Sequence, residues 1–267
     1  MIRTKWLKSA GLAAGLTLSL LTSGALAAET IKLGVMGGPE EEIAEAAKKV
    51  AASKGLDVQL VIFSDYVLPN AALDAGELYA NAFQHQPYLD VQLKSHNYHI
   101  VPVGYTIVEP IGLYSKKIGK VGDLKNGAKI GIPNDPSNGG RALNLLAANG
   151  LIKLKDGKGL QPTLLDIVEN PKKLVIVELD AAQLPRSLPD LDAAVINTNH
   201  ALNGGLHPGK DALLQEPRQN NPYGNIIVVR EQDKNKDTTK LLVESYQSPE
   251  VAKFLEERFH GAIQPAW

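Results

Sequence analysis

The chain contains no cysteine among its 267 residues. Disulfide bonds, thiol catalysis and cysteine-ligated zinc sites are therefore excluded. A lipid anchor on a cysteine, the mark of bacterial lipoproteins, is not expected either. Aromatic residues are also scarce, with only four Phe, two Trp and eight Tyr. A short stretch in which several aromatic side chains gather is for this reason a candidate functional site.

A strong excess of positive charge is missing as well, because the formal net charge is −1. No basic stripe of the kind that binds nucleic acid is present, and no polybasic cluster for anionic lipids. The G-x-x-x-x-G-K-[ST] phosphate loop, the G-x-S-x-G elbow, H-E-x-x-H and a glycine-rich nucleotide fingerprint are absent too. We expect no nucleic-acid partner and no cofactor.

The N-terminus has the pattern of a signal peptide. Three basic residues lie within the first eight, and the stretch 10–21 is uncharged and rich in Leu and Ala. Small residues at Ala25 and Ala27 give the A-x-A cleavage pattern, so we expect residues 1–27 to be removed after Ala27 or Ala28. An N-terminal membrane anchor is the alternative, although the apolar run is shorter than the about 20 residues that span a bilayer. Removal would change the net charge to −4 and leave a soluble periplasmic protein.

Apolar periodicity predicts an α/β fold. Runs typical of strands, with alternating or continuous apolar residues, are 31–35, 57–63, 99–108, 128–133, 173–179, 192–198 and 225–231. Helical spacing, with proline or acidic starts and glycine ends, predicts helices from Pro39 to about Gly55 and at 141–150, 237–247 and 249–261. The strand–helix–strand opening is typical of a parallel sheet.

About 240 mature residues suit two lobes of ordinary size. The segment 108–115 is predicted to carry the chain from one lobe to the other, and the segment 225–231 to bring it back. We therefore expect residues 28–111 with 229–267 in lobe 1 and residues 112–228 in lobe 2. Two crossings would form a hinge with a cleft between the lobes.

The stretch "IPNDPSNGGRAL" indicates an anion site. A strand ends there, Asp135, Asn138 and two glycines are predicted to form a turn, and Arg141 falls in the first turn of the following helix. Backbone N–H groups at a helix start favour an anion, and a guanidinium matches a carboxylate with two parallel hydrogen bonds. The alternative is a surface arginine beside a turn whose glycines only satisfy backbone geometry.

Asparagine side chains stand at the ends of two other predicted strands, at the carboxyl end of one and at the start of the other. Asn197 and Asn199 stand at the end of "AAVINTN", where ligands bind in open α/β sheets. Asn197 could instead be a helix cap. Asn225 begins the strand 225–231 beside Tyr223, and these two could equally be ordinary turn residues.

The stretch "NAFQHQPYLD" places Phe83, His85 and Tyr88 within six residues. His85 could act as a base, bind a metal or form the wall of a small-molecule pocket. His96 and His99 have near-metal spacing but no carboxylate on a matched face, so we expect no metal site. No nucleophile–base pair is apparent, which argues against an enzyme.

Several long motifs together resemble the NlpA/MetQ family of methionine-binding components of bacterial ABC importers. They are "SDYVLPNAAL", "NAFQHQPYLD", "YSKKI", "IPNDPSNGGRAL", the stretch 151–188, "AAVINT" and "PYGNIIVVRE", and the resemblance runs from about residue 31 to 267. The positions that the family pattern implies for ligand binding are Tyr66, Phe83, His85, Tyr88, Asn138, Arg141, Asn197, Tyr223 and Asn225.

The resemblance implies a periplasmic-binding-protein fold, two α/β lobes closing on a ligand, and no chemistry. The implied partners are methionine, with L-methionine expected first, and an ABC permease with its ATPase; a monomer is expected. The missing cysteine departs from the usual family pattern and implies a protein that is free in the periplasm. The loop "NHALNGGLHPG" and Gly224 also depart from the pattern, and loops there can border the cleft. D-methionine, a methionine dipeptide or another amino acid therefore remain alternatives. An enzyme with His85 as base and a surface-interaction protein are the other classes.

Overall fold

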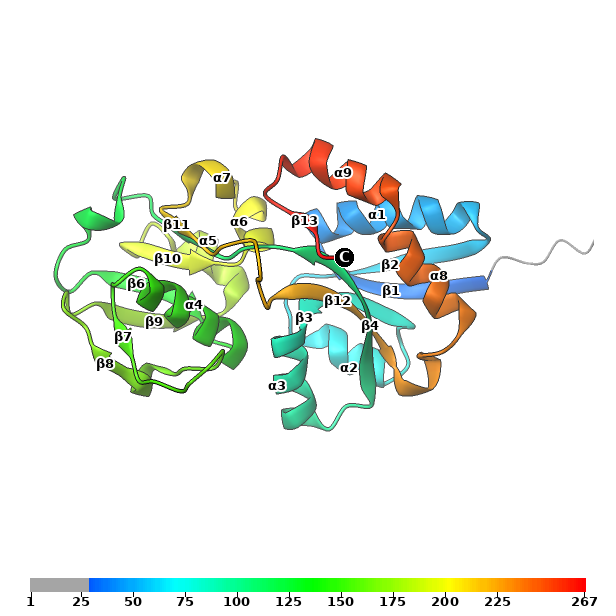
Figure 1. The fold of residues 1–267 in the computed structure, drawn as a ribbon, viewed down its shortest axis with the longest axis horizontal. Helices are drawn as coiled ribbons and strands as arrows, with labels where there is room; N and C mark the ends of the chain where they lie inside the picture. Colours follow the sequence, from blue (N-terminus) through cyan, green and yellow to red (C-terminus); the bar gives the residue numbers. More distant parts are fainter. Residues whose placement is uncertain (1–28) are drawn as a thin grey trace, which may run out of the picture.

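The computed structural model describes residues 29–267, which form two α/β units lying side by side (Figure 1). The signal-peptide prediction lies outside these residues. The strands are β1 (Glu29–Met36), β2 (Leu56–Phe63), β3 (Ala80–His85), β4 (Ile100–Val108), β5 (Gly112–Tyr114), β6 (Lys129–Pro133), β7 (Lys153–Leu154), β8 (Ile167–Glu169), β9 (Val175–Leu179), β10 (Ala193–Ile196), β11 (Leu214–Gln215), β12 (Gly224–Arg230) and β13 (Gln264–Pro265). The α-helices are α1 (Pro39–Ser53), α2 (Leu68–Asp74), α3 (Gln86–His96), α4 (Pro136–Ala148), α5 (Leu184–Ser187), α6 (Thr198–Asn203), α7 (Pro208–Asp211), α8 (Asp237–Tyr246) and α9 (Pro249–Phe259).

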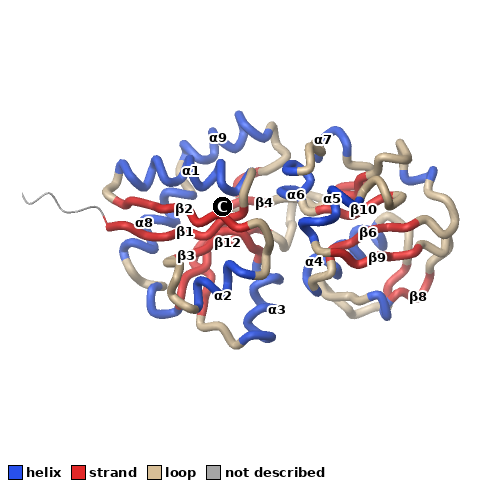
Figure 2. Tube along the Cα trace, turned by 180° about the vertical axis from the view of Figure 1, so that it is seen from behind, coloured by secondary structure: helices blue, strands red, loops and turns tan. Residues whose placement is uncertain are grey.

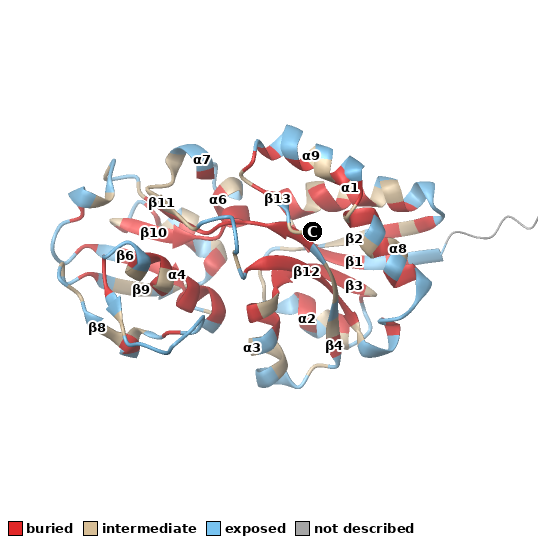
Figure 3. Cartoon of the chain, in the orientation of Figure 1, coloured by how far each residue is buried: buried red, intermediate tan, exposed pale blue. Residues whose placement is uncertain are grey.

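The first unit is built on a mixed sheet with the strand order β13-β4-β12-β3-β1-β2. β1 pairs in parallel with β2 and β3, as the strand–helix–strand opening predicted, whereas β12 is antiparallel to both β3 and β4. The helices α1, α8 and α9 cover one face, and α2 and α3 cover the other (Figure 1; Figure 2 shows the arrangement from behind). The central strands β3 and β12 are almost wholly buried, whereas β2 and β4 are buried only in part (Figure 3).

The second unit has the strand order β11-β5-β10-β6-β9. β6 pairs in parallel with β10 and with the edge strand β9, and β5 is antiparallel to β10. Apolar side chains of α4 pack on one face of this sheet, and α5 packs on the other. Each unit therefore has its own hydrophobic core. Separately, no helix within residues 29–267 is long and apolar enough to cross a membrane.

The chain passes between the two sheets twice, after β4 and before β12. The first passage agrees with the predicted segment 108–115. The segment 225–231 is a strand as predicted, β12, but it lies inside the six-stranded sheet, so the return passage precedes Gly224. The lobe bounds given above remain a proposal, and this pairing favours ending the second lobe before Gly224 instead of at residue 228.

The helix α4 begins five residues earlier than predicted. Pro136 occupies its first turn, and the Asp135 side chain caps it by accepting the Asn138 N–H at 2.8 Å. These two signals outweigh the low helix propensity of the two glycines. The expected turn at 134–140 is thus wrong, and Arg141 lies in the second helical turn instead of the first.

Gly140 does not form a turn. It lets the backbone of α4 lie close to the backbone of Leu160 and Gln161. A Cβ atom at this position would lie 2.7 Å from the Leu160 carbonyl oxygen and 3.0 Å from the Gln161 Cα. We expect Gly140→Ala to destabilise the protein by roughly 1–2 kcal/mol, because overpacking exceeds the gain in helix propensity. Chemical denaturation measures this change. Gly122→Ala is the control, since nothing lies within 4 Å of its Cβ position; equal effects of the two substitutions would contradict the packing explanation.

Candidate functional site

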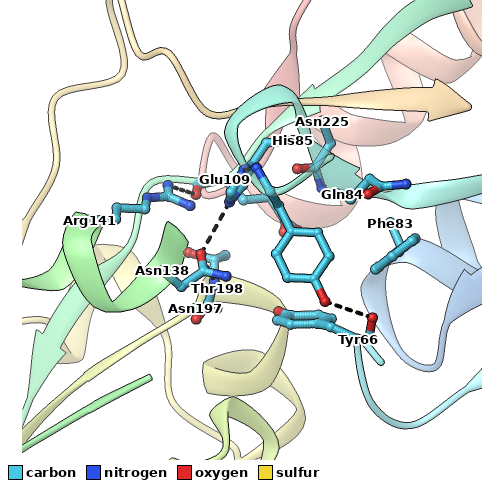
Figure 4. Close-up of a pocket in the computed structure, with 11 residues that line it drawn as sticks. Tyr66, Phe83, Gln84, His85, Glu109, Asn138, Arg141, Asn197, Thr198 and Asn225 are labelled. Carbon is cyan, nitrogen blue, oxygen red and sulfur yellow. Dashed lines mark hydrogen bonds between the residues drawn. The ribbon is translucent and has the colours of Figure 1, made fainter. Parts of the chain in front are cut away.

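A pocket lies between the two units and is lined by side chains from both (Figure 4). About 350 Å³ of space, including its opening to solvent, is free of protein atoms. The lining residues are Tyr66, Phe83, Gln84, His85, Tyr88, Glu109, Asn138, Arg141, Asn197, Thr198 and Asn225. Of the ligand-binding candidates named from the sequence, Tyr223 and Asn199 are not in the lining, and the others are. Residues far apart in the chain meet here because β3, β12, α4 and the end of β10 all reach the boundary between the units.

The junction of β3 and α3 positions His85. Its Nδ1 accepts the Tyr88 backbone N–H at 3.2 Å and so caps α3. Because Nδ1 is an acceptor, Nε2 carries the proton and donates to the Asn138 Oδ1 at 3.1 Å. Burial, and next the Arg141 charge, lower the pKa of His85 to about 3. His85 is a neutral wall of the pocket, with neither the pKa nor a free nitrogen for a general base.

Aromatic rings form one half of the pocket. Tyr66 lies 6.1 Å from Phe83 and 6.1 Å from Tyr88, centroid to centroid, and Phe83 and Tyr88 meet edge to face at 6.0 Å. The buried Met36 packs against these rings. The Tyr88 hydroxyl donates to the Tyr66 backbone carbonyl at 2.9 Å, which orients the Tyr88 ring. This half offers polarisable, uncharged surface to a ligand.

Asn138 holds the polar half together. Its Oδ1 accepts hydrogen bonds from His85 and from the Asn197 Nδ2 at 3.0 Å, and its Nδ2 donates to Asp135. Asn197 stands at the N-cap position of α6, yet its side chain makes no capping bond. Among the residues that the structure describes, the buried Asn197 Oδ1 has no hydrogen-bond partner. Asn197 therefore keeps a free acceptor beside the pocket.

Arg141 is a buried residue, only 3% exposed, and not the surface arginine of the alternative interpretation. Its Nε donates to the Glu216 Oε1 at 2.9 Å, and its Nη2 donates to the Glu216 Oε2 at 2.6 Å. Nη2 also donates to the Glu109 carbonyl oxygen at 2.8 Å. The ring of Tyr223 lies under the guanidinium, 4.2 Å from the Cζ. The paired hydrogen bonds that the sequence assigned to a ligand carboxylate are made with Glu216.

Glu109 is the pocket residue that sequence reasoning missed. It lies in "VEPIGLYS", the segment predicted to cross between the lobes. Its side chain is 8% exposed, and its Oε1 has no partner within residues 29–267. Burial raises the pKa of Glu109 to about 7, and Arg141 opposes this rise. Its one sequence signal was an isolated acid inside an apolar stretch.

Glu40 lies behind the pocket wall, and the lining residues Thr198 and Gln84 are held by hydrogen bonds to the protein. Burial, followed by the charge of Glu109, raises the pKa of Glu40 well above its usual range. Thr198 donates to the Pro110 carbonyl oxygen at 2.6 Å, and Gln84 bonds the buried Asn70. Within the described part of the chain no group of three His, Asp or Glu residues could hold a metal ion.

Hydrogen bonds across the boundary hold the two units against each other. His85 of the first unit bonds Asn138 of the second, and the Tyr66 hydroxyl donates to the Asn199 Oδ1 at 2.8 Å. The Asn203 Nδ2 donates to the Gly37 carbonyl oxygen at 2.9 Å. Asn199 thus does not line the pocket but accepts a hydrogen bond that holds the two units together. The structure is that of a closed cleft.

Two α/β units, joined by two crossings and closed over a half-aromatic, half-polar pocket, define a solute-binding protein of the periplasmic type. The chain belongs to the NlpA lipoprotein family, whose model matches residues 31–267. It is 54% identical over 240 residues, 89% of this chain and 88% of the relative, to the D-methionine-binding lipoprotein MetQ of Escherichia coli K12.

Two further comparisons agree. Lipoprotein 28 of Escherichia coli K12 is 50% identical over 259 residues, covering 96% of this chain and 95% of that protein. The solved structure of a nutrient-binding protein from Burkholderia cenocepacia bound to methionine is 54% identical, with a TM-score of 0.87 over 89% of this chain and 100% of that chain. The periplasmic-binding-protein fold expected from the sequence is confirmed.

Proposed function

We propose that this protein binds free methionine in the pocket between its lobes and delivers it to an ABC importer. The observation that carries the proposal is the division of the pocket into three aromatic rings on one side and unmatched donors and acceptors on the other. A thioether side chain suits aromatic faces, at roughly 0.3–1.5 kcal/mol per contact. The methionine-bound relative, more than half identical, supports the same ligand.

The polar half can satisfy both charges of an amino-acid head group. Arg141 retains the two N–H groups of Nη1, which suit the α-carboxylate. The Glu109 Oε1 and the Asn197 Oδ1 are free acceptors for the ammonium group. An amino acid buried in a closed cleft needs both matches, since an unpaired buried charge costs several kcal/mol. The proposed site residues are Tyr66, Phe83, His85, Tyr88, Glu109, Asn138, Arg141, Asn197 and Asn225, with Tyr223 supporting Arg141.

We infer binding without turnover. His85 is neutral and has both ring nitrogens in hydrogen bonds, so it cannot serve as the base that the enzyme alternative assigned to it. The partners that we propose are an ABC permease and its ATPase at the inner membrane, reached by a monomeric protein in the periplasm. Cleavage near Ala27 and the absence of lipidation stay predictions from the sequence.

A thermal-shift titration tests the proposal. Saturating L-methionine should stabilise the folded protein by about 2.7 kcal/mol at a concentration of 100 Kd, which corresponds to a rise in Tm of roughly 5–10 °C for a protein of this size. L-norleucine, which has a methylene in place of the sulfur, is the matched control and should give a smaller shift. D-methionine and methionine dipeptides belong in the same panel. No shift with any of these compounds would exclude the function.

A further inference from the structure

Glu216 lies outside the pocket lining and connects Arg141 to the passages between the lobes. It follows β11 at the start of the return passage, and its side chain is 10% exposed. Its Oε2 accepts the Ile111 backbone N–H at 3.1 Å, and its own backbone N–H donates to the Ile111 carbonyl at 3.0 Å. Ile111 belongs to the first passage. Glu216 thus links the return passage, to which it belongs, with the first passage and with the buried guanidinium.

The donors of Arg141 can be assigned one by one. A guanidinium has five N–H groups. Glu216 accepts from Nε and Nη2, and the Glu109 carbonyl accepts the second N–H of Nη2. Only the two N–H groups of Nη1 are unassigned among the contacts of residues 29–267. A ligand carboxylate can therefore meet Arg141 at Nη1 alone.

Contacts restrict the face of the Arg141 guanidinium as well as its N–H groups. The Tyr223 ring lies 4.2 Å from the Cζ of Arg141 and blocks one face. Asn221 donates from Nδ2 to the Glu216 Oε2 at 3.2 Å, and its Oδ1 accepts the Tyr223 N–H at 2.9 Å. The return passage therefore positions both the carboxylate and the ring that surround Arg141. Such support reduces the orientations that the guanidinium can adopt.

We propose that Glu216 is a positioning residue that orients Arg141 so that Nη1 faces the α-carboxylate of the ligand. It acts through Arg141 and does not touch the ligand itself. Because Glu216 also bonds both passages, recognition of the carboxylate is tied to the hinge between the lobes. This inference rests on the proposed function, since it assumes an amino acid with a free carboxylate as ligand.

The decisive measurement is a ratio of affinities. Isothermal titration with L-methionine and with L-methioninol, which has a hydroxymethyl group in place of the carboxylate, gives the preference for the carboxylate in each variant. Glu216→Gln keeps the side-chain size but removes the charge and one acceptor, and Glu216→Asp keeps the charge but shortens the side chain. We expect Glu216→Gln to reduce the preference for methionine over methioninol about tenfold, because it weakens a charge-assisted pair of hydrogen bonds. Glu216→Asp should reduce the preference less.

The matched control is a second arginine–carboxylate pair within residues 29–267, Arg230 with Asp233. Asp233 is fully buried and accepts from the Nε and Nη2 of Arg230, away from the pocket. Asp233→Asn should lower the Tm but leave the methionine-to-methioninol ratio unchanged. In an Arg141→Ala background, Glu216→Gln should produce no further change in the ratio.

The outcomes separate this inference from the proposed function. If the unsubstituted protein fails to bind methionine, the function itself is wrong. If it binds methionine and Glu216→Gln weakens both ligands equally, Glu216 has a structural role only. A ratio that increases in Glu216→Gln would mean that the Glu216 charge opposes the ligand carboxylate, and it would also overturn the inference.

Discussion

Arg141→Ala is expected to lower the affinity for L-methionine by about 100-fold or more. The substitution removes the Nη1 donors proposed for the ligand carboxylate, and it leaves the Glu216 carboxylate unpaired beside the pocket. Breaking a buried ion pair by removing one partner costs about 3–5 kcal/mol, and every 1.4 kcal/mol is about a factor of ten in affinity. Part of this cost falls on folding, so stability must be measured together with binding.

Isothermal titration measures the affinity, and chemical denaturation of the unliganded variant measures the stability. Arg258→Ala is the matched control, because Arg258 makes the same paired hydrogen bonds to Glu42 on the surface, where it is 54% exposed. It should leave binding unchanged. The double variant Arg141→Ala with Glu216→Ala removes the unpaired carboxylate and should recover stability without binding. Binding within tenfold of the unsubstituted protein would show that another group holds the carboxylate.

Glu109→Gln is expected to weaken L-methionine binding by about 30-fold or more at pH 8 and to remove most of its pH dependence. A charged hydrogen bond to the ligand ammonium contributes roughly 2–5 kcal/mol when buried. Burial raises the pKa of Glu109 to about 7 in the unliganded closed protein. An ammonium group beside the carboxylate favours its ionised form and lowers this pKa in the complex.

The affinity for methionine depends on pH because the pKa of Glu109 differs between the unliganded protein and the complex. Below a pH of about 7 the unliganded protein holds a proton at Glu109 that the complex releases, so affinity should fall as the pH decreases from 7. The folding stability of the unliganded protein changes in the opposite direction. Folded Glu109 holds its proton above the ordinary value of 4.5, so stability should fall as the pH rises from 4.5 through about 7. Glu109→Gln should remove this loss.

Titration calorimetry from pH 5 to 8 measures how the affinity depends on pH. The Tm of the unliganded protein over the same range measures how its folding stability depends on pH. The buried His85 and His200 stay neutral across this window, since their pKa values are lowered to about 3 and about 4. Glu169→Gln changes an exposed carboxylate paired with Lys153 and is the control. A pH profile that persists unchanged in Glu109→Gln would assign the titration to another group, with the neighbouring Glu40 as the first to examine.

Local signals in the sequence predicted much of the secondary structure. The helices expected at 237–247 and 249–261 are α8 (Asp237–Tyr246) and α9 (Pro249–Phe259). Apolar spacing defines both without help from distant residues, with an acidic start in α8 and a proline start in α9. The strand β3 received no prediction. It is buried along its whole length, yet Asn81 and Gln84 interrupt its apolar run. Their amides bond the buried Asn70, a partner that periodicity cannot indicate.

The sequence alone determined most of the side chains that gather at the cleft, because the family motifs carry them and strand ends in α/β sheets lie at one edge. Only the tertiary structure decided how each of them is used. The partner of Arg141 is Glu216, 75 residues away, and the two meet because the passages between the lobes bond each other. Contacts at that separation depend on how the chain crosses between the two sheets, which leaves no local pattern. For the same reason Glu109, an isolated acid in the sequence, became a free acceptor in the pocket only when the fold buried it.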